Sequence, residues 1–202
     1  MPPTQRRPTD DELLDAAMAA FAEHGFANAG MSQIAEDAGS TKPTLYAHFG
    51  SKENLFNRVV QRELTRIVTD ILPRYDEVGD QGIEESVDTL ITVGMNYISA
   101  NPQARQLIRV SIEASADPML SQFLAINEIF TAKVAELVER HLETIDAKIT
   151  SGNPRAIAAT IVGSGIALAH HMLVHGDDDF ERLARMLSTF LSGGLQALTH
   201  RR

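Results

Sequence analysis

The segment that decides the fold is Gly39-Ser-Thr-Lys-Pro-Thr-Leu-Tyr-Ala-His-Phe-Gly-Ser-Lys-Glu-Asn-Leu55. Thr41 can cap a short helix with its hydroxyl, and Pro43 then falls in the first turn, where a missing N–H costs nothing. Leu45 and Phe49 are four residues apart and share the face that packs inward. The other side of this helix carries Lys42, Thr44, Tyr46 and His48. These polar, aromatic and cationic groups are of the kind that contact base edges and phosphates.

A second short helix is predicted immediately upstream, from Met31 to Ala38. Its apolar residues Ile34, Ala35 and Ala38 form one stripe at helical spacing, and Gly39 then turns the chain. Two short helices joined by a tight turn are typical of a helix-turn-helix, in which the second helix enters the major groove of DNA. The segment therefore predicts a DNA-binding head.

The same residues resemble the DNA-binding domain of the TetR family of bacterial transcriptional regulators, over Leu13 to Val59. That family's usual run is Ile-Ala-x-x-Ala-Gly-Val-Ser-x-(Gly or Pro)-Thr-Leu-Tyr-x-(His or Tyr)-Phe-x-x-Lys-x-x-Leu, which fixes about a dozen positions at set spacings. Two positions depart from it, because Gly30 stands where a capping Thr is common and Ser40 replaces the usual Val. Gly30 has no hydroxyl to offer a phosphate.

The resemblance implies specific DNA contacts. Lys42, Pro43 and Thr44 would face bases in the major groove, and Tyr46 and His48 would contact the backbone or base edges. Lys52 would hold a phosphate at the start of the next helix. The run from Arg109 to Phe123 also resembles the body of the AefR-like branch of the family.

Composition limits the class of protein. The chain has 202 residues, 44% of them apolar, and no Cys, which excludes disulfides, zinc fingers and thiol chemistry. The formal net charge is −9, yet residues 40–62 hold four basic side chains against one acidic side chain, a local balance of +3. No signal peptide and no apolar run of membrane-spanning length are apparent, so we expect a cytoplasmic protein with no membrane partner.

The remaining pattern predicts an all-α fold of about nine helices. Thr9-Asp-Asp-Glu12 is a capping box, Gly25 ends the first helix, Ser51 caps a long fourth helix, and Pro73 marks the approximate end of that helix. No stretch shows a strand signal. Further helices are predicted at 82–100, after Pro102, and at 118–143, 154–175 and 180–198. Asn153 is the expected cap of the helix that begins at Pro154. We therefore expect a three-helix head at 1–54, joined by the long helix to a ligand-binding and dimerisation body at 55–202.

The last two predicted helices are rich in small side chains, which allow helices to approach closely. They include Gly163, Ser164, Gly165, Gly193 and Gly194. This pattern predicts a homodimer through residues 154–198, an arrangement that the TetR resemblance also implies. The alternative is tight packing within one subunit.

A small, largely apolar effector is expected between helices 82–100, 118–143 and 154–175, and no cofactor is expected. The candidate lining residues are Met95, Phe123, Asn127, Phe130, His171 and Met172. Apolar residues at helical spacing also form ordinary core, so the core is the alternative role for the apolar members of this set.

Three histidines invite a metal hypothesis, since His171 and His175 share a helix face. No Cys, and no Glu at the position of a zinc protease motif, accompanies them. We therefore expect no metal, and a solvated or pocket-lining role instead. The favoured function is a ligand-responsive repressor that binds a near-palindromic operator as a homodimer. The alternative is an all-helical enzyme or small-molecule carrier that uses His170, His171 and His175.

Overall fold

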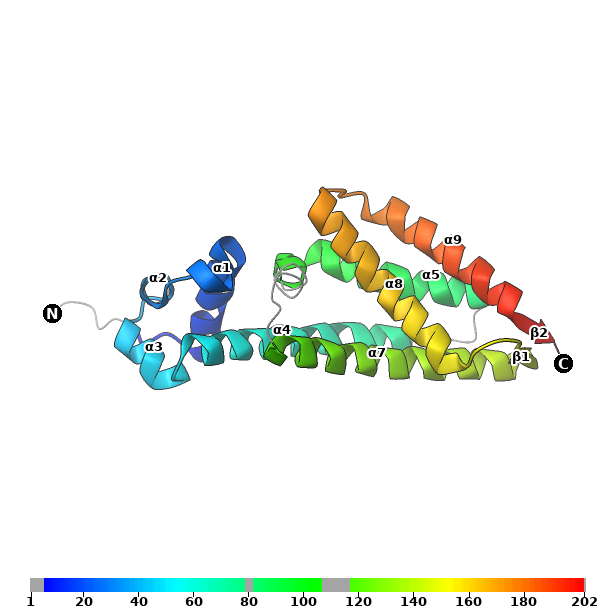
Figure 1. Ribbon diagram of the computed structural model, residues 1–202, viewed down its shortest axis with the longest axis horizontal. Helices are drawn as coiled ribbons and strands as arrows, with labels where there is room; N and C mark the ends of the chain where they lie inside the picture. The colour runs from blue at the N-terminus through cyan, green and yellow to red at the C-terminus, as the bar shows by residue number, and fades with distance from the viewer. Residues whose placement is uncertain (1–5, 79–81, 107–116, 202) are drawn as a thin grey trace.

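In the computed structural model, which describes residues 6–78, 82–106 and 117–201, a three-helix head stands at one end of an elongated helical body (Figure 1). Helix α4 runs from the head into the body beside α7. Helices α5, α8 and α9 lie above this pair in the view of Figure 1. Eight complete helices occupy the described residues: α1 (Asp10–Asn28), α2 (Met31–Asp37), α3 (Lys42–Phe49), α4 (Lys52–Asp76), α5 (Ile83–Ala100), α7 (Asp117–Thr144), α8 (Pro154–His175) and α9 (Phe180–Leu198). Residues 102–106 are also helical, as expected for a helix that begins at Pro102. The all-α prediction is confirmed.

The predicted caps form as the sequence indicates. The Thr9 hydroxyl accepts a hydrogen bond from the backbone of Glu12, while the Glu12 carboxylate accepts one from the Thr9 backbone N–H at 2.8 Å. Thr41, Ser51 and Asn153 each accept a bond from the backbone N–H three residues later. Each cap satisfies an N–H that has no partner within its helix, which explains where these helices begin.

Gly25 and Pro73 both differ from simple helix ends. Gly25 has a φ of 73°, which breaks the helical path, but the chain resumes helical geometry and α1 runs on to Asn28. Phe26 packs against Phe21, with ring centroids 5.9 Å apart. Pro73 lies inside α4, which continues to Asp76. A proline near a helix end removes only one backbone hydrogen bond, and burial of Tyr75 in the body favours the extra turn.

The expectation of no strand is wrong for two short segments. Strand β1 (Ala147–Ile149) pairs antiparallel with β2 (Thr199–Arg201), with Lys148 opposite His200. Each strand has only three residues, too few for a period-two pattern to be visible in the sequence. The pairing depends on contacts between segments far apart in the chain.

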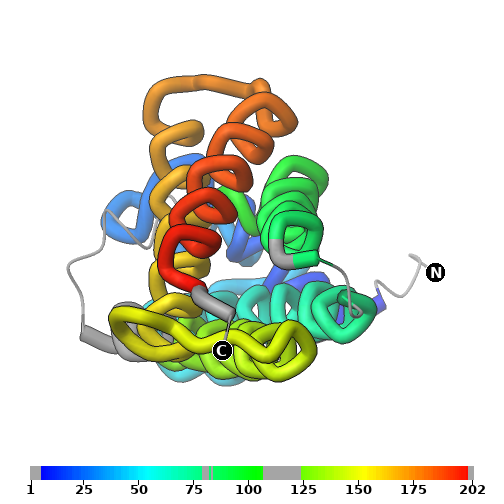
Figure 2. The backbone as a smooth tube through the Cα atoms, turned by 90° about the vertical axis from the view of Figure 1, so that its right-hand side faces the viewer, coloured from blue at the N-terminus to red at the C-terminus, as the bar shows by residue number. Residues whose placement is uncertain are grey.

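Two apolar clusters meet along α4. The head cluster includes Phe21, Leu45 and Leu55 and reaches Leu64, whereas the body cluster begins on α4 at Ile71. Viewed along the long axis, α9 lies between α8 and α5, with α4 and α7 beneath them (Figure 2). Helix α5 packs mainly against α9, and α7 against α8.

Two features connect the head to the body. Ile67 and Ile126 are partly buried and pack against both apolar clusters. The side-chain amide of Gln106 donates a hydrogen bond to the Ala22 carbonyl on α1. The head and the body are therefore in contact through side chains as well as through α4.

Candidate nucleic-acid interface and effector cavity

Helix α3 has one anchored face and one free face. Leu45 is fully buried and Phe49 is 8% exposed, so the helix is fixed to the head through this side. The sequence-predicted contact residues Lys42, Pro43, Tyr46 and His48 are exposed, and Thr44 is half-buried. The structure therefore brings these five predicted residues together on one short helix.

The exposed groups of α3 already have partners within the head. The Thr41 and Thr44 hydroxyls are 2.8 Å apart, and the Lys42 ammonium lies 6.0 Å from the centroid of the Tyr46 ring. His48 Nε2 lies 3.1 Å from Asp10 Oδ1. These contacts limit the freedom of the side chains before any ligand arrives, which lowers the entropic cost of binding.

Lys52 has a structural partner that the sequence did not indicate. Its ammonium donates to the Ala27 carbonyl at 3.0 Å and lies 5.0 Å from the centroid of the Phe26 ring. This contact ties the start of α4 to the end of α1. An ammonium has three donors, so the Ala27 bond leaves capacity for a phosphate oxygen. At Gly30, α2 begins without a side-chain cap, as the missing hydroxyl predicts.

Arg62 is a further residue of the head that sequence reasoning missed. Its guanidinium donates to Asp15 Oδ1 at 2.6 Å, to the Asp11 carbonyl at 3.1 Å and to Glu63 Oε1 at 3.0 Å. Burial alone would lower the pKa of Arg62, but the hydrogen bonds and charges of Glu63 and Asp15 raise it on balance. Arg62 therefore stays charged and links α4 to Asp11 and Asp15 on α1.

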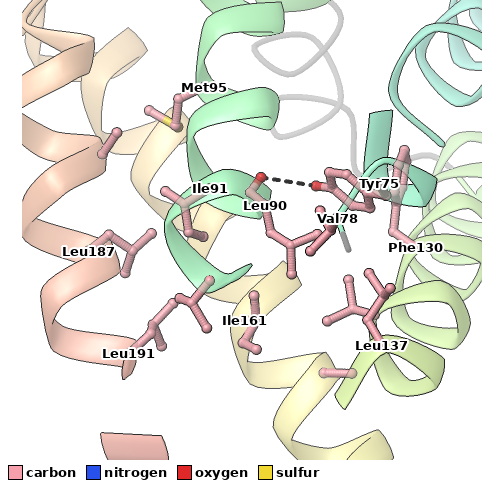
Figure 3. Packing of buried hydrophobic residues seen from close by; sticks show 14 of the residues in the cluster. Tyr75, Val78, Leu90, Ile91, Met95, Phe130, Leu137, Ile161, Leu187 and Leu191 are labelled. Atoms are coloured by element: carbon pink, nitrogen blue, oxygen red, sulfur yellow. Dashed lines mark hydrogen bonds between the residues drawn. The ribbon is translucent and has the colours of Figure 1, made fainter. Parts of the chain in front are cut away.

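A cavity of about 130 Å³ lies within the body between α4, α5, α7 and α8. Figure 3 shows part of this packing, with Leu90, Met95, Phe130 and Ile161 contributed by three of these helices. Its lining is almost entirely apolar and includes Leu64, Ile67, Ile71, Leu90, Ile91, Met95, Ile98, Ile126, Phe130, Val134, Ile161 and Val162. Such a cavity suits a hydrocarbon group.

Few polar groups reach this wall. The Tyr75 hydroxyl donates to the Leu90 carbonyl at 3.2 Å (Figure 3), and burial raises the pKa of Tyr75 to about 12. Burial also raises the pKa of Tyr97, with a smaller contribution from the negative charges of Asp70 and Glu63. Asn127 supplies an amide. Burial therefore favours the neutral form of both phenols.

The structure separates the predicted pocket residues into three groups. Met95, Asn127 and Phe130 lie on the cavity wall. His171 is exposed and Met172 is buried in the body core, and neither lies on this wall. Phe123 lies outside the residues whose side chains are described. The wall contributed by α4 was missed, because its apolar stripe fits a core equally well.

The three histidines do not converge on a metal site. His171 and His175 stack with ring centroids 4.5 Å apart. Among the described residues, no group of three or more His, Asp or Glu side chains is placed to hold a metal ion. The enzyme or carrier alternative therefore finds no metal centre in the described part of the chain.

The outer surface of α8 and α9 exposes large apolar side chains. Phe190 is 76% exposed, Val174 59% and Met186 53%. Helix α8 is also long and apolar enough to cross a membrane by length and composition alone, a property that core and interface helices share. Gly165 does not belong to this surface, since it lines the cavity and a Cβ there would meet Ile91 at 4.0 Å.

Comparison with known proteins agrees with this geometry. The family model described as bacterial regulatory proteins, tetR family, matches residues 13–59. The transcriptional activator FasR of Mycolicibacterium smegmatis is 28% identical over 171 residues, which cover 83% of this chain and 75% of FasR. The transcriptional repressor SCO4008 of Streptomyces coelicolor is 30% identical, over 50% of this chain and 47% of its own length.

Solved structures share the whole fold. The fatty acid degradation regulator FadR of Bacillus halodurans superposes with a TM-score of 0.75 at 21% identity, covering 92% of this chain and 99% of that protein. FadR of Bacillus subtilis, in complex with stearoyl-CoA, gives a TM-score of 0.75 at 16% identity over the same shares. The AefR-like branch is not confirmed, and residues 109–116 of the run that suggested it lie outside the described residues. Residues 13–59 therefore match the TetR family of bacterial transcriptional regulators, and the whole chain is similar to known transcriptional regulators in sequence and in fold.

Proposed function

We propose that the protein is a ligand-responsive repressor that acts in the cytoplasm as a homodimer on a near-palindromic operator. The observation that carries this proposal is the polar, aromatic and cationic face of α3, which is exposed while Leu45 and Phe49 anchor the opposite face. Two such helices related by a twofold axis would enter successive major grooves.

The proposed DNA contacts divide into two kinds. Lys42, Pro43 and Thr44, at the start of α3, would meet base edges, where side chains carry sequence preference. Tyr46, His48 and Lys52 would contact the backbone or base edges, with Lys52 on a phosphate. Because the whole chain is acidic and its positive charge is local, binding relies on a few placed contacts. The salt dependence per subunit should therefore be modest.

The proposed dimer uses the outer surface of α8 and α9. The exposed side chains of Val174, Met186 and Phe190 lie on these two helices, and the adjacent Gly193 and Gly194 permit close approach. Large apolar side chains that are exposed together on neighbouring helices often mark a protein–protein contact. A second copy supplies an identical surface through twofold symmetry.

The proposed effector is small and largely apolar, in keeping with the cavity wall. One solved relative is described in complex with stearoyl-CoA, which also has a long hydrocarbon chain. Ile67 lines the cavity and also packs against the head cluster. An effector that moves Ile67 would shift the head relative to the body. The two α3 helices of the dimer, the reading helices, would then no longer match the spacing of successive major grooves in the DNA.

The alternative enzyme or carrier would have to use His170, His171 and His175. His171 and His175 are exposed, and neither lies on the wall of the apolar cavity. This arrangement brings no histidine to the place where a small apolar molecule would bind, and it leaves the exposed face of α3 unexplained. We therefore favour the regulator.

The first test uses Lys52→Ala on operator DNA selected from random sequence. If Lys52 holds a phosphate, its loss should weaken binding to all sequences, because a phosphate contact carries no sequence information. The slope of log affinity against log salt should become shallower by about 0.9 per subunit. Fluorescence anisotropy over a range of salt concentrations measures both quantities.

A matched control is Lys148→Ala, which removes the same charge from β1 at the far end of the molecule. It should leave the slope unchanged. If Lys52→Ala also keeps the wild-type slope while lowering the melting temperature, Lys52 serves only to hold Ala27. Failure of the wild-type protein to enrich any sequence would contradict the regulator proposal itself.

A further inference from the structure

We propose that Asn127 marks the mouth of the effector cavity and that Arg155, just outside it, binds the acidic head group of an amphipathic effector. The ligand class is a small organic anion with a hydrocarbon tail. This inference rests on the effector cavity of the proposed function and names the chemistry that the cavity and its surroundings would recognise.

Asn127 locates the mouth of the cavity because it lines both the buried cavity and a groove on the surface. A surface groove runs between α7 and the first turns of α8, lined by Leu124, Asn127, Glu128, Thr131, Asn153, Arg155, Ala156 and Ala159. Asn127 also lies on the wall of the buried cavity. A molecule that extends from the cavity towards the groove would therefore pass the Asn127 amide.

The polarity of the surroundings changes at the same place. The cavity wall is almost entirely apolar, whereas the groove has two amides, a hydroxyl, a carboxylate and a guanidinium. Within the described part of the chain, the Asn127 side chain makes no hydrogen bond to another residue. A partly buried amide without a partner favours a ligand that supplies one. This gradient fits a molecule with an apolar end and a polar end.

The groups in the groove favour a negative head. Arg155 forms an ion pair with Glu128, and this pair links α8 to α7 across the groove. Both side chains are more than half exposed, and such pairs contribute little stability. A carboxylate from a ligand can therefore replace Glu128 and accept two parallel bonds from the guanidinium. The Asn127 amide and the Thr131 hydroxyl offer further donors.

The groove and the exposed Val174 of the proposed dimer surface lie at opposite ends of α8. Arg155 contacts Glu128 on α7 and lies in the first turn of α8, whereas Val174 is near the other end of that helix. Figure 1 shows the first turns of α8 next to α7 and its last turns near the start of α9. The proposed dimer contacts at Val174, Met186 and Phe190 do not include any residue that lines the groove.

The cavity volume sets the length of the tail for a first probe. A dry cavity of roughly 150 Å³ holds a molecule the size of benzene. The cavity of about 130 Å³ therefore suits roughly six carbons, with the remaining carbons in the groove. Octanoate meets this limit, and 1-octanol and octylamine keep its tail while the head becomes neutral or cationic.

The experiment measures binding of these three probes to the full-length protein by isothermal titration calorimetry, without DNA. Wild-type protein should bind octanoate most tightly. Arg155→Gln should weaken octanoate binding about ten-fold, as expected for the loss of a charge-assisted hydrogen bond, and leave 1-octanol unchanged. Glu128→Gln should strengthen octanoate binding, because it removes the carboxylate that competes for Arg155.

The matched control is Arg140→Gln, which removes an exposed arginine of α7 that pairs with Glu136 outside the groove. It should bind octanoate like the wild type. Equal affinities for octanoate and 1-octanol, a preference for octylamine, no binding of any probe, or wild-type octanoate affinity in Arg155→Gln would each overturn the inference. Since the titration contains no DNA, failure of operator binding would leave this result interpretable.

Discussion

At the scale of single residues, Tyr75 shows how burial of an ionisable side chain makes the stability of the fold depend on pH. Its ring packs against Phe130 with centroids 5.9 Å apart, and its hydroxyl bonds to the Leu90 carbonyl (Figure 3). Burial raises the pKa of Tyr75 from 10.0 to about 12. The unfolded chain therefore loses this proton at a lower pH than the folded protein does.

The consequence is a prediction for stability in alkali. The stabilising effect of neutral Tyr75 is complete below pH 10 and is lost as pH rises towards 12, at up to about 1.4 kcal/mol per pH unit. Tyr75→Phe lacks this titration, so its deficit in unfolding free energy should shrink over that range. Urea unfolding at pH 8, 10 and 11 measures the difference. Tyr46→Phe, at an exposed site, should run parallel to the wild type, and parallel curves for Tyr75→Phe would refute the assignment.

The exposed face of α3 could be predicted from the sequence because helical spacing alone separates Leu45 and Phe49 from Tyr46 and His48. The partner of Lys52 could not. The Ala27 carbonyl is available because it lies in the last turn of α1, where carbonyls have no partner within the helix. The neighbouring Phe26 ring lies 5.0 Å from the Lys52 ammonium. A contact between residues this far apart in the chain depends on tertiary packing, which local pattern does not encode.

At the scale of elements, the joint between α1 and α4 depends on Arg62. This side chain is 12% exposed and contacts Asp11 and Asp15 on α1, as well as Glu63, which is 6% exposed. Removing Arg62 leaves Glu63 buried with Arg66 as its remaining ion-pair partner among the described residues. A buried charge that loses a partner is costly.

Arg62→Gln should therefore lower the free energy of unfolding by on the order of 2–3 kcal/mol. It should also weaken operator binding, because α1 supports the reading helix through the head core. Thermal and urea unfolding give the first quantity, and anisotropy gives the second. Arg74→Gln, an exposed arginine on the same helix, should change neither. A stable Arg62→Gln protein would show that apolar packing alone holds α1 to α4.

The extent of each element was predictable where a local rule sets it. Thr9, Thr41, Ser51 and Asn153 place four helix starts because capping needs only the next three residues. Pro73 gives the end of α4 only approximately, and the helix continues to Asp76 because burial of Tyr75 outweighs the local preference. The β1–β2 pair also depends on contacts between distant parts of the chain, because it pairs residues near 148 with residues near 200. Local sequence rules therefore do not predict it.

At the scale of the whole molecule, the sequence indicated α5, α7 and α8 as the walls of a cavity but not α4. Helix α4 appeared as a link between head and body, yet Leu64, Ile67 and Ile71 place it on the cavity wall. The small residues of the last two helices likewise allowed two interpretations, a dimer interface or close packing within one subunit. Gly165 faces the cavity rather than the outer surface, so replacing it would test the cavity and not the dimer.

Phe190 gives the sharper test of the dimer, because its side chain is 76% exposed and Met186 lies one turn earlier on α9. A twofold interface contains two copies of Phe190, one from each subunit. Phe190→Asp should therefore destabilise the dimer by about 3 to 6 kcal/mol. The dissociation constant should rise about 100-fold or more. Light scattering at micromolar concentration should then report monomers, and operator affinity should fall with them. Ile129→Asp, an exposed apolar position on α7, is the matched control and should remain dimeric. A dimeric Phe190→Asp protein would move the interface away from α9, and a monomeric wild type would leave the two reading helices without the spacing that a palindromic operator requires.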